Sequence, residues 1–281
     1  MTTRKKRLLI GLYLLSAALL FLYIGFPSEA LRAHVSHSLN AGLPGLSVAI
    51  GDMRPALPAG LVLKGVRVYH ANAPLAVIEK LSIHPDLFSL WQAKPRYDFD
   101  GTVGDGQIAG TAEIDNAGGR KRVSLNARLT GVLLQKLPAT QSLFGNKLAG
   151  RLDGTLGVND AGALTGKLSV SEGRVELATP LFDQNVFGFR TAEAEISLQN
   201  RTVMVRNGRM KGNDMDAEVS GTIALDMAPG KNALALSGRV TPHPAFMAKV
   251  EGSLPPSPQR RRAGISFKVS GALNAPGLSF N

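Results

Sequence analysis

The stretch MDAEVSGTIALD (residues 215–226) shows the pattern that decides the fold of this chain. Its odd positions, from Met215 to Leu225, are apolar or glycine, and its even positions are mostly polar or charged. A period of two is typical of a β-strand that buries one face and shows the other to water. Strands with two such different faces indicate an antiparallel sheet.

The same alternation recurs along most of the 281-residue chain, most clearly in residues 123–129, 194–198, 234–240 and 265–273. Turn signals separate these segments: Asn116-Ala-Gly-Gly, Asn159-Asp-Ala-Gly, Asn200-Arg201, Asn207-Gly and Pro229-Gly. Together they predict roughly fourteen short strands. Glycines inside the strands predict the bends of a curved sheet; they include Gly150, Gly154, Gly221, Gly238 and Gly271.

Two apolar segments interrupt the strand pattern. Residues 85–91 carry Leu87, Phe88, Leu90 and Trp91, and they predict a short helical turn. Residues 132–144 predict a second helix, broken at Pro138. Because both segments are apolar, we expect them to plug an end or a side of the sheet.

The N-terminus predicts a membrane anchor. Arg4, Lys5, Lys6 and Arg7 precede residues 8–26, a run of 19 residues without a charge. As a helix this run spans about 28 Å, close to the ~30 Å of a bilayer core. Its predicted lipid-facing residues include Leu8, Leu12, Leu15, Leu19, Leu22 and Phe26.

The four basic residues orient this anchor, because such residues stay in the cytoplasm. Residues 27–281 are then exported, and the protein is predicted to be a single-pass inner-membrane protein with a periplasmic domain. The alternative is a cleaved signal peptide, since Ser28 and Ala30 have the spacing of a cleavage site. The apolar part of a signal peptide is roughly 7–15 residues, and this longer run favours the anchor.

Three parts of the chain follow from these patterns. Residues 1–26 form the basic flank and the anchor. Residues 27–45 form a juxtamembrane helix whose apolar stripe is Leu31, Val35 and Leu39. Residues 46–281 form the periplasmic sheet domain.

Composition excludes several classes of function. The chain has no cysteine, so disulfides and thiolate sites are absent. The net charge is +11, and 28 basic and 21 acidic residues remain without the N-terminal four. These charges are dispersed, or lie in loops rich in glycine and proline, and aromatic residues are only 6% of the chain. A nucleic-acid-binding face is therefore not predicted.

The sequence carries no catalytic signature. His34 and His37 lie three residues apart on the juxtamembrane helix, but no third ligand is spaced to join them on a metal. There is no G-x-S-x-G motif, and the acidic residues alternate with apolar ones on the wet face of strands. We predict no enzyme activity, no cofactor and no metal site.

Three segments carry a resemblance to a known family. They are LSIHPDLFSLW (81–91) with FDGTVGDGQIAG (99–110), LAGRLDGTLG (148–157), and the closing FKVSGALNAPGLSF (267–280). With the basic flank and single anchor, this plan resembles the type II secretion system protein N family. The closing segment is similar to the ending of the AsmA-like repeat superfamily, to which that family is related. The likeness extends over nearly the whole chain.

The resemblance implies a mostly β protein whose long, curved antiparallel sheet forms a taco-like trough in the periplasm. Candidate residues for an apolar groove inside it are Val219, Ile223, Leu225, Phe267 and Val269. The alternative is that these side chains pack only on one another or on the helical plugs.

Two functions remain open at this point. The first is an accessory or scaffold subunit of a type II secretion system, with inner-membrane lipid and other envelope proteins as partners. The second is an AsmA-like lipid-binding or lipid-transfer protein, with phospholipid acyl chains in the groove. A glycan hydrolase or peptidase is a distant third.

Overall fold

The computed structural model describes most of the chain after residue 26. The described residues are 13, 25, 27–42, 46–57, 59–70, 73–115, 122–142, 147–181, 184–225, 233–249, 264–272 and 275–280. The predicted anchor therefore lies outside them, apart from Tyr13 and Gly25, as do Arg4, Lys5, Lys6 and Arg7. Within the part that is described, no helix is long and apolar enough to cross a membrane.

Strands dominate the fold. The first seven are β1 (Leu46–Ala49), β2 (Asp52–Pro55), β3 (Leu61–His70), β4 (Ala73–Pro85), β5 (Arg96–Val103), β6 (Gly106–Asp115) and β7 (Arg122–Leu133). The next four are β8 (Lys147–Val158), β9 (Leu164–Leu181), β10 (Gln184–Gln199) and β11 (Thr202–Gly212). The last four are β12 (Met215–Ala224), β13 (Ala233–Pro242), β14 (Ile265–Ala272) and β15 (Ala275–Phe280).

Helices are few and short in the described chain. They are α2 (Ser28–Gly42), the 3-10 turns η1 (Ser89–Trp91) and η3 (Leu134–Lys136), α3 (Pro138–Ser142) and α4 (Pro244–Lys249). A helix is present within the predicted range 27–45: it is α2, Ser28–Gly42, and its Leu31 and Val35 pack on the sheet. No pattern in the sequence predicts α4.

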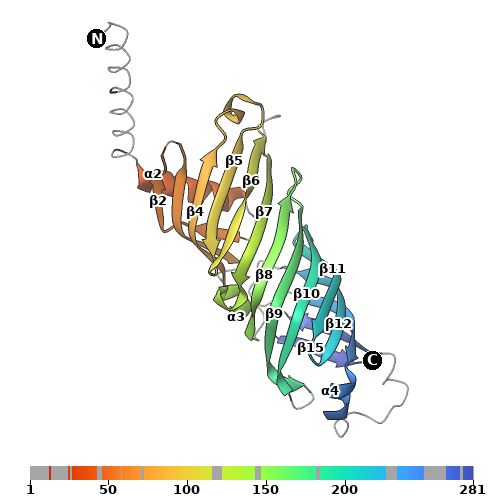
Figure 1. The fold of residues 1–281 in the computed structure, drawn as a ribbon. Helices are drawn as coiled ribbons and strands as arrows, with labels where there is room; N and C mark the ends of the chain where they lie inside the picture. The colour runs from red at the N-terminus through yellow and green to blue at the C-terminus, as the bar shows by residue number, and fades with distance from the viewer. Residues whose placement is uncertain are drawn as a thin grey trace.

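All fifteen strands belong to one antiparallel sheet (Figure 1). Its order is β1-β3-β4-β5 and then every strand in sequence to β15, while β2 pairs with β3 beside β1. Nearly every strand therefore pairs with its neighbours in the chain, as expected of successive hairpins. The mostly β, antiparallel prediction is confirmed, with one strand more than the estimate.

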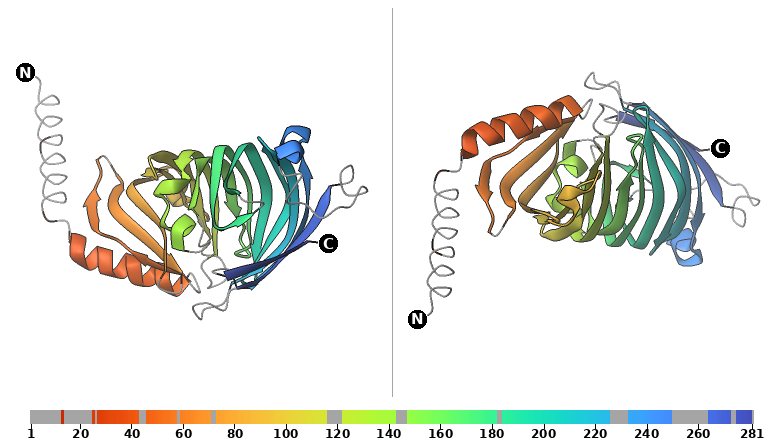
Figure 2. Two further views of the ribbon diagram at one scale, coloured as in Figure 1. Left: turned by 90° about the horizontal axis from the view of Figure 1, so that it is seen from below. Right: turned by 90° about the horizontal axis from the view of Figure 1, so that it is seen from above.

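The sheet is open and curved. Seen along its length it forms an arch, with α2 on the open side of the arch (Figure 2). Leu31 and Val35 of α2 pack against Leu63 and Val66 of β3, so the face beneath α2 is the concave one.

Two predicted turns are confirmed. Asn200 and Arg201 join β10 to β11 with φ values of 49° and 63°, the left-handed pair that a two-residue hairpin needs. In the loop after β8, the side-chain oxygen of Asn159 accepts hydrogen bonds from the backbone N–H groups of Ala161 and Ala163.

One predicted turn is wrong. Asn207-Gly208 does not separate strands but lies inside β11, where the pairing with β12 shifts between Val205 and Gly208. Asn207 has a φ of 51° there. The Asn-Gly pair therefore makes a β-bulge, which needs the same positive φ as a turn.

The prediction for the two apolar interruptions is corrected in part. In residues 85–91 only Ser89–Trp91 form a 3-10 turn, and the apolar side chains of this segment point into solvent instead of plugging the sheet. In residues 132–144, Val132 and Leu133 end β7, and the helical part is η3 and α3. This second segment does pack on the sheet, because α3 contacts both β4 and β8.

Candidate functional site

The register of the sheet defines one continuous apolar face. Residues directly opposite one another in paired strands point to the same side. On β12 and β13 these pairs are Val219 with Gly238 and Ile223 with Leu234. Followed from strand to strand, the same face carries Leu63, Leu81, Phe99, Ile108, Leu129, Leu156, Leu168, Ile196, Val203, Leu236 and Val269.

This apolar face is the concave one, because it includes the residues of β3 and β4 on which α2 packs. We call it the trough. The apolar residues named on β5 to β14 are half-buried, except Leu234, which is 8% exposed. In the described chain α2 packs at the end of the sheet formed by β1 to β4. An apolar face of this extent that helices cover only in part is typical of a surface that binds something.

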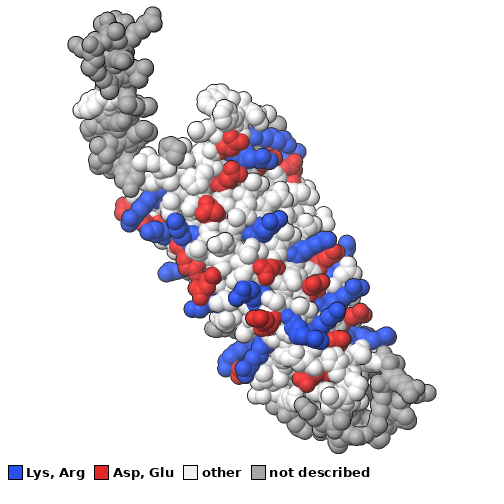
Figure 3. All heavy atoms as spheres, viewed as in Figure 1, with Lys and Arg blue, Asp and Glu red and all other residues white. Residues whose placement is uncertain are grey.

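The opposite, convex face is charged. Figure 3 shows Lys, Arg, Asp and Glu side chains of both signs spread over it. Several pair between neighbouring strands, such as Arg96 with Glu113 at 2.8 Å and Lys147 with Glu176 at 3.1 Å. Such exposed pairs contribute little to stability, typically about 0–1 kcal/mol each. They keep this face hydrated, so the continuous apolar surface lies on the concave face.

One ion pair on the convex face shifts a pKa. Lys167 lies 3.2 Å from Glu195, and the Asn207 amide donates a hydrogen bond of 3.2 Å to the same carboxylate. The hydrogen bonds from Lys167 and Asn207, together with the Lys167 charge, lower the pKa of the Glu195 carboxyl below its ordinary value. The Glu195 side chain is 44% exposed, and the pair orients side chains on the surface of the sheet.

Glycines in the wall of the trough make room for aromatic rings from neighbouring strands. The ring of Phe189 occupies the place of a β-carbon on Gly173, its direct partner in β9. A β-carbon on Gly238 would come within 2.6 Å of the ring of Phe267. Covering a glycine with a cross-strand aromatic ring compensates for the missing side chain. The glycines are therefore part of the trough wall.

Short helices close part of the trough at one end of the strands. Phe246 of α4 is only 2% exposed and packs on Met215, Phe187 and Val240 of the apolar face. The segment after β7 is also buried, with Leu134 only 6% exposed. Beside α4, an apolar hollow of about 180 Å³ is lined by Val175, Leu177, Phe187, Gly188, Phe189, Met210, Asp214 and Met215.

The structure brings four of the five predicted groove residues together. Val219, Ile223, Phe267 and Val269 lie on the trough face of β12 and β14, which flank β13. Leu225 lies just beyond the end of β12, where its backbone N–H donates to the carbonyl of Arg201. The sequence pattern did not point to Phe189, which follows Gly188, or to Phe246, which lies between Ala245 and Met247 outside any alternating run.

No catalytic arrangement stands out in the described chain. No group of three or more His, Asp or Glu side chains lies close enough there to hold a metal ion. Of the His34 and His37 pair, the side chain of His34 lies outside the described part of the chain.

Fold and site together define an open antiparallel sheet with an apolar trough on one face. Compared with protein-family models, with curated proteins and with solved structures, the chain gives no match.

Proposed function

We propose that this protein is a membrane-anchored periplasmic accessory subunit of a type II secretion system. The observation that supports the proposal most is the architecture: one antiparallel sheet, in almost sequential strand order, curved around an apolar face. This is the arrangement that the resemblance to the protein N family implies. The basic flank and the apolar residues 8–26 supply the anchor in this proposal.

The free edge of the sheet is the proposed contact for a partner subunit. β15 is the last strand, and no other strand of the described chain pairs with its outer side. Leu278 on β15 is 47% exposed. An unpaired edge presents backbone N–H and C=O groups to an incoming strand, which is a common way to bind a partner protein.

Deletion of the gene tests this function. We expect proteins that normally reach the medium through the type II pathway to accumulate in the periplasm, and a plasmid-borne copy to restore their export. Quantitative comparison of medium and periplasm measures the effect. An unchanged distribution of these proteins would contradict the secretion role.

A second candidate function is lipid binding, and the uncovered trough favours it. The half-buried residues on β5 to β14 present apolar surface that an acyl chain would cover. Each buried CH₂ group contributes about 0.8 kcal/mol, so a chain of ordinary length gains enough to bind stably. Carriage of lipid and a role in secretion are compatible in one protein, and each needs its own test.

Native mass spectrometry of the full chain in detergent tests lipid binding. We expect co-purified phospholipid in the wild-type protein and less of it in Ile223→Lys, which places a charge in the trough. Thr222→Lys is the matched control, because Thr222 is the next residue of β12 and faces the convex side. Equal phospholipid in both variants would contradict lipid binding in the trough.

A further inference from the structure

The loop between β4 and β5 exposes the most prominent apolar side chains of the described chain. Phe88 is 87% exposed and Trp91 is 86% exposed, and Leu87 and Leu90 are 48% and 42% exposed. We call these four residues the apolar loop. Large aromatic side chains in water at this level are unusual for a loop that has no partner.

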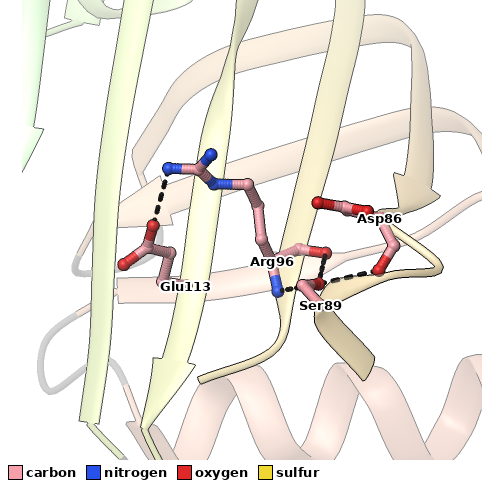
Figure 4. A network of polar contacts seen from close by, with 4 residues as sticks. All are labelled: Asp86, Ser89, Arg96 and Glu113. Atoms are coloured by element: carbon pink, nitrogen blue, oxygen red, sulfur yellow. Dashed lines mark hydrogen bonds and ion pairs between the residues drawn. The ribbon is translucent and has the colours of Figure 1, made fainter. Parts of the chain in front are cut away.

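Hydrogen bonds hold the loop in this exposed shape (Figure 4). The hydroxyl of Ser89, a residue only 4% exposed, donates to the carbonyl of Asp86 at 2.7 Å and accepts from the backbone N–H of Arg96 at 2.8 Å. The backbone N–H of Asp86 donates to the carbonyl of Arg96 at 2.9 Å, and that of Phe88 to the Asp86 carboxylate at 3.0 Å. The apolar side chains are thus presented outward by a fixed frame.

The charges around the loop are paired. Lys94 lies 3.2 Å from Asp115 and 3.7 Å from Asp160, and Arg96 lies 2.8 Å from Glu113. The hydrogen bond and charge of Asp115 raise the pKa of Lys94, so its ammonium stays protonated. With these charges matched, the loop offers an apolar and aromatic surface, and attraction to an anionic or a cationic partner does not dominate.

We propose that the apolar loop inserts into the interfacial region of a lipid bilayer, the one in which residues 8–26 are anchored. The inference rests on the anchoring in the proposed function. Only Pro27 separates residues 8–26 from α2, which begins at Ser28. α2 has 15 residues and is about 22 Å long, so the sheet stays near the bilayer.

The chemistry of the loop also favours lipid over a protein partner. Trp settles at the boundary between headgroups and acyl chains, and Phe and Leu beside it supply the apolar face of an interfacial segment. In Figure 1 the connection between β4 and β5 protrudes at the upper end of the sheet, while α2 lies at its upper left. A protruding tip with paired charges fits the deformable interfacial region of a bilayer better than a flat protein surface.

Trp91 is the only tryptophan in the chain, so its fluorescence reports on this loop alone. The test uses the full chain in vesicles of phosphatidylethanolamine and phosphatidylglycerol, with and without bromine on the acyl chains. We expect brominated lipid to quench Trp91 at least twofold and to do so equally at high salt. Acrylamide, a quencher in water, should reach Trp91 less well in vesicles than in detergent.

The triple variant L87S/F88S/L90S keeps Trp91 as a reporter, and we expect it to lose most of the quenching by brominated lipid. Val123→Ser is the control, since Val123 is 47% exposed on β7 outside the loop, and its quenching should match wild type. Flotation of the vesicles measures anchoring separately.

The outcomes are distinct. Protein that floats with the vesicles while Trp91 stays unquenched by brominated lipid overturns the insertion of the loop and leaves the anchoring intact. Protein that fails to float overturns both. Quenching that persists in the triple variant also overturns the role of the loop residues.

Discussion

The ring of Phe189 on β10 covers Gly173 on β9, and the three atoms nearest to a β-carbon on Gly173 would all belong to that ring. The two residues are direct register partners on the trough face. Phe189 is 6% exposed and borders the apolar hollow beside α4. This contact shows how the wall of the trough is built: a glycine on one strand makes room for an aromatic ring from the next.

Gly173→Ala should therefore destabilise the protein, because the added methyl group overlaps the Phe189 ring. We expect a loss of about 1–3 kcal/mol in the free energy of unfolding, measured by urea titration. In a Phe189→Ala background the same change should cost much less. The double-mutant cycle of Gly173→Ala and Phe189→Ala should therefore give a coupling energy of about 0.5–3 kcal/mol. Gly157→Ala is the control, since its nearest neighbour is 3.4 Å from the β-carbon position. An equal cost with and without Phe189 would refute this contact.

Arg201→Gly should stabilise the hairpin between β10 and β11. Arg201 has a φ of 63°, a backbone conformation that glycine adopts without strain. Relief of that strain contributes roughly 1 kcal/mol or more to stability. This exceeds the free-energy cost of the extra conformational entropy that glycine gives the unfolded chain. Thermal unfolding should show a higher Tm. Arg209→Gly, in the middle of β11, should lower it, and a lower Tm for both variants would contradict this account of the turn.

Ser89→Ala should loosen the apolar loop. It leaves the backbone N–H of Arg96 without the hydroxyl that accepts its hydrogen bond at 2.8 Å. A buried donor left unsatisfied costs about 1–3 kcal/mol. The anisotropy of Trp91 fluorescence should fall in detergent solution, because the side chains beside residue 89 become more mobile. Ser220→Ala, on the convex face of β12, is the control and should leave the anisotropy unchanged. An unchanged anisotropy in Ser89→Ala as well would contradict the role of Ser89 in holding the loop.

Lys167→Gln should raise the pKa of Glu195. The hydrogen bonds and charge that now lower this pKa favour the carboxylate in the folded state, so their contribution to stability is present at neutral pH. It disappears as the pH falls through the lowered pKa. In Lys167→Gln the carboxyl should titrate closer to its ordinary pKa of about 4.3, measured by NMR of labelled glutamate carbons. Asn207→Ala should shift it in the same direction, and an unchanged titration in both variants would contradict the pairing.

Much of the sheet could be predicted from the sequence, because one apolar face and one polar face leave a period of two in every strand. The alternation at residues 215–226 therefore predicts β12. In the structure this strand covers Met215–Ala224. The prediction of a turn at Asn207-Gly208 was wrong, because a bulge inside a strand and a turn require the same positive φ. The prediction that the apolar loop plugs the sheet was wrong for another reason. Apolar composition alone does not tell whether Phe88 and Trp91 face a core or the solvent.

The candidate site was predicted less completely. Val219, Ile223, Phe267 and Val269 share the trough face because period-two positions in registered strands must do so. The Phe189 contact and the Phe246 plug depend on which strands and helices meet in space. Pairing between strands and the position of α4 decide those contacts, and neither is encoded in a local pattern.

The secretome of a deletion strain carrying trough variants tests the central claim most directly. The strain should accumulate type II substrates in the periplasm, and wild-type protein or Thr222→Lys should restore their export. Ile223→Lys, present at the same level in the membrane fraction, should fail to restore it, because its charge lies in the trough. Full export in the deletion strain, or equal restoration by both lysine variants, would contradict a trough that serves type II secretion.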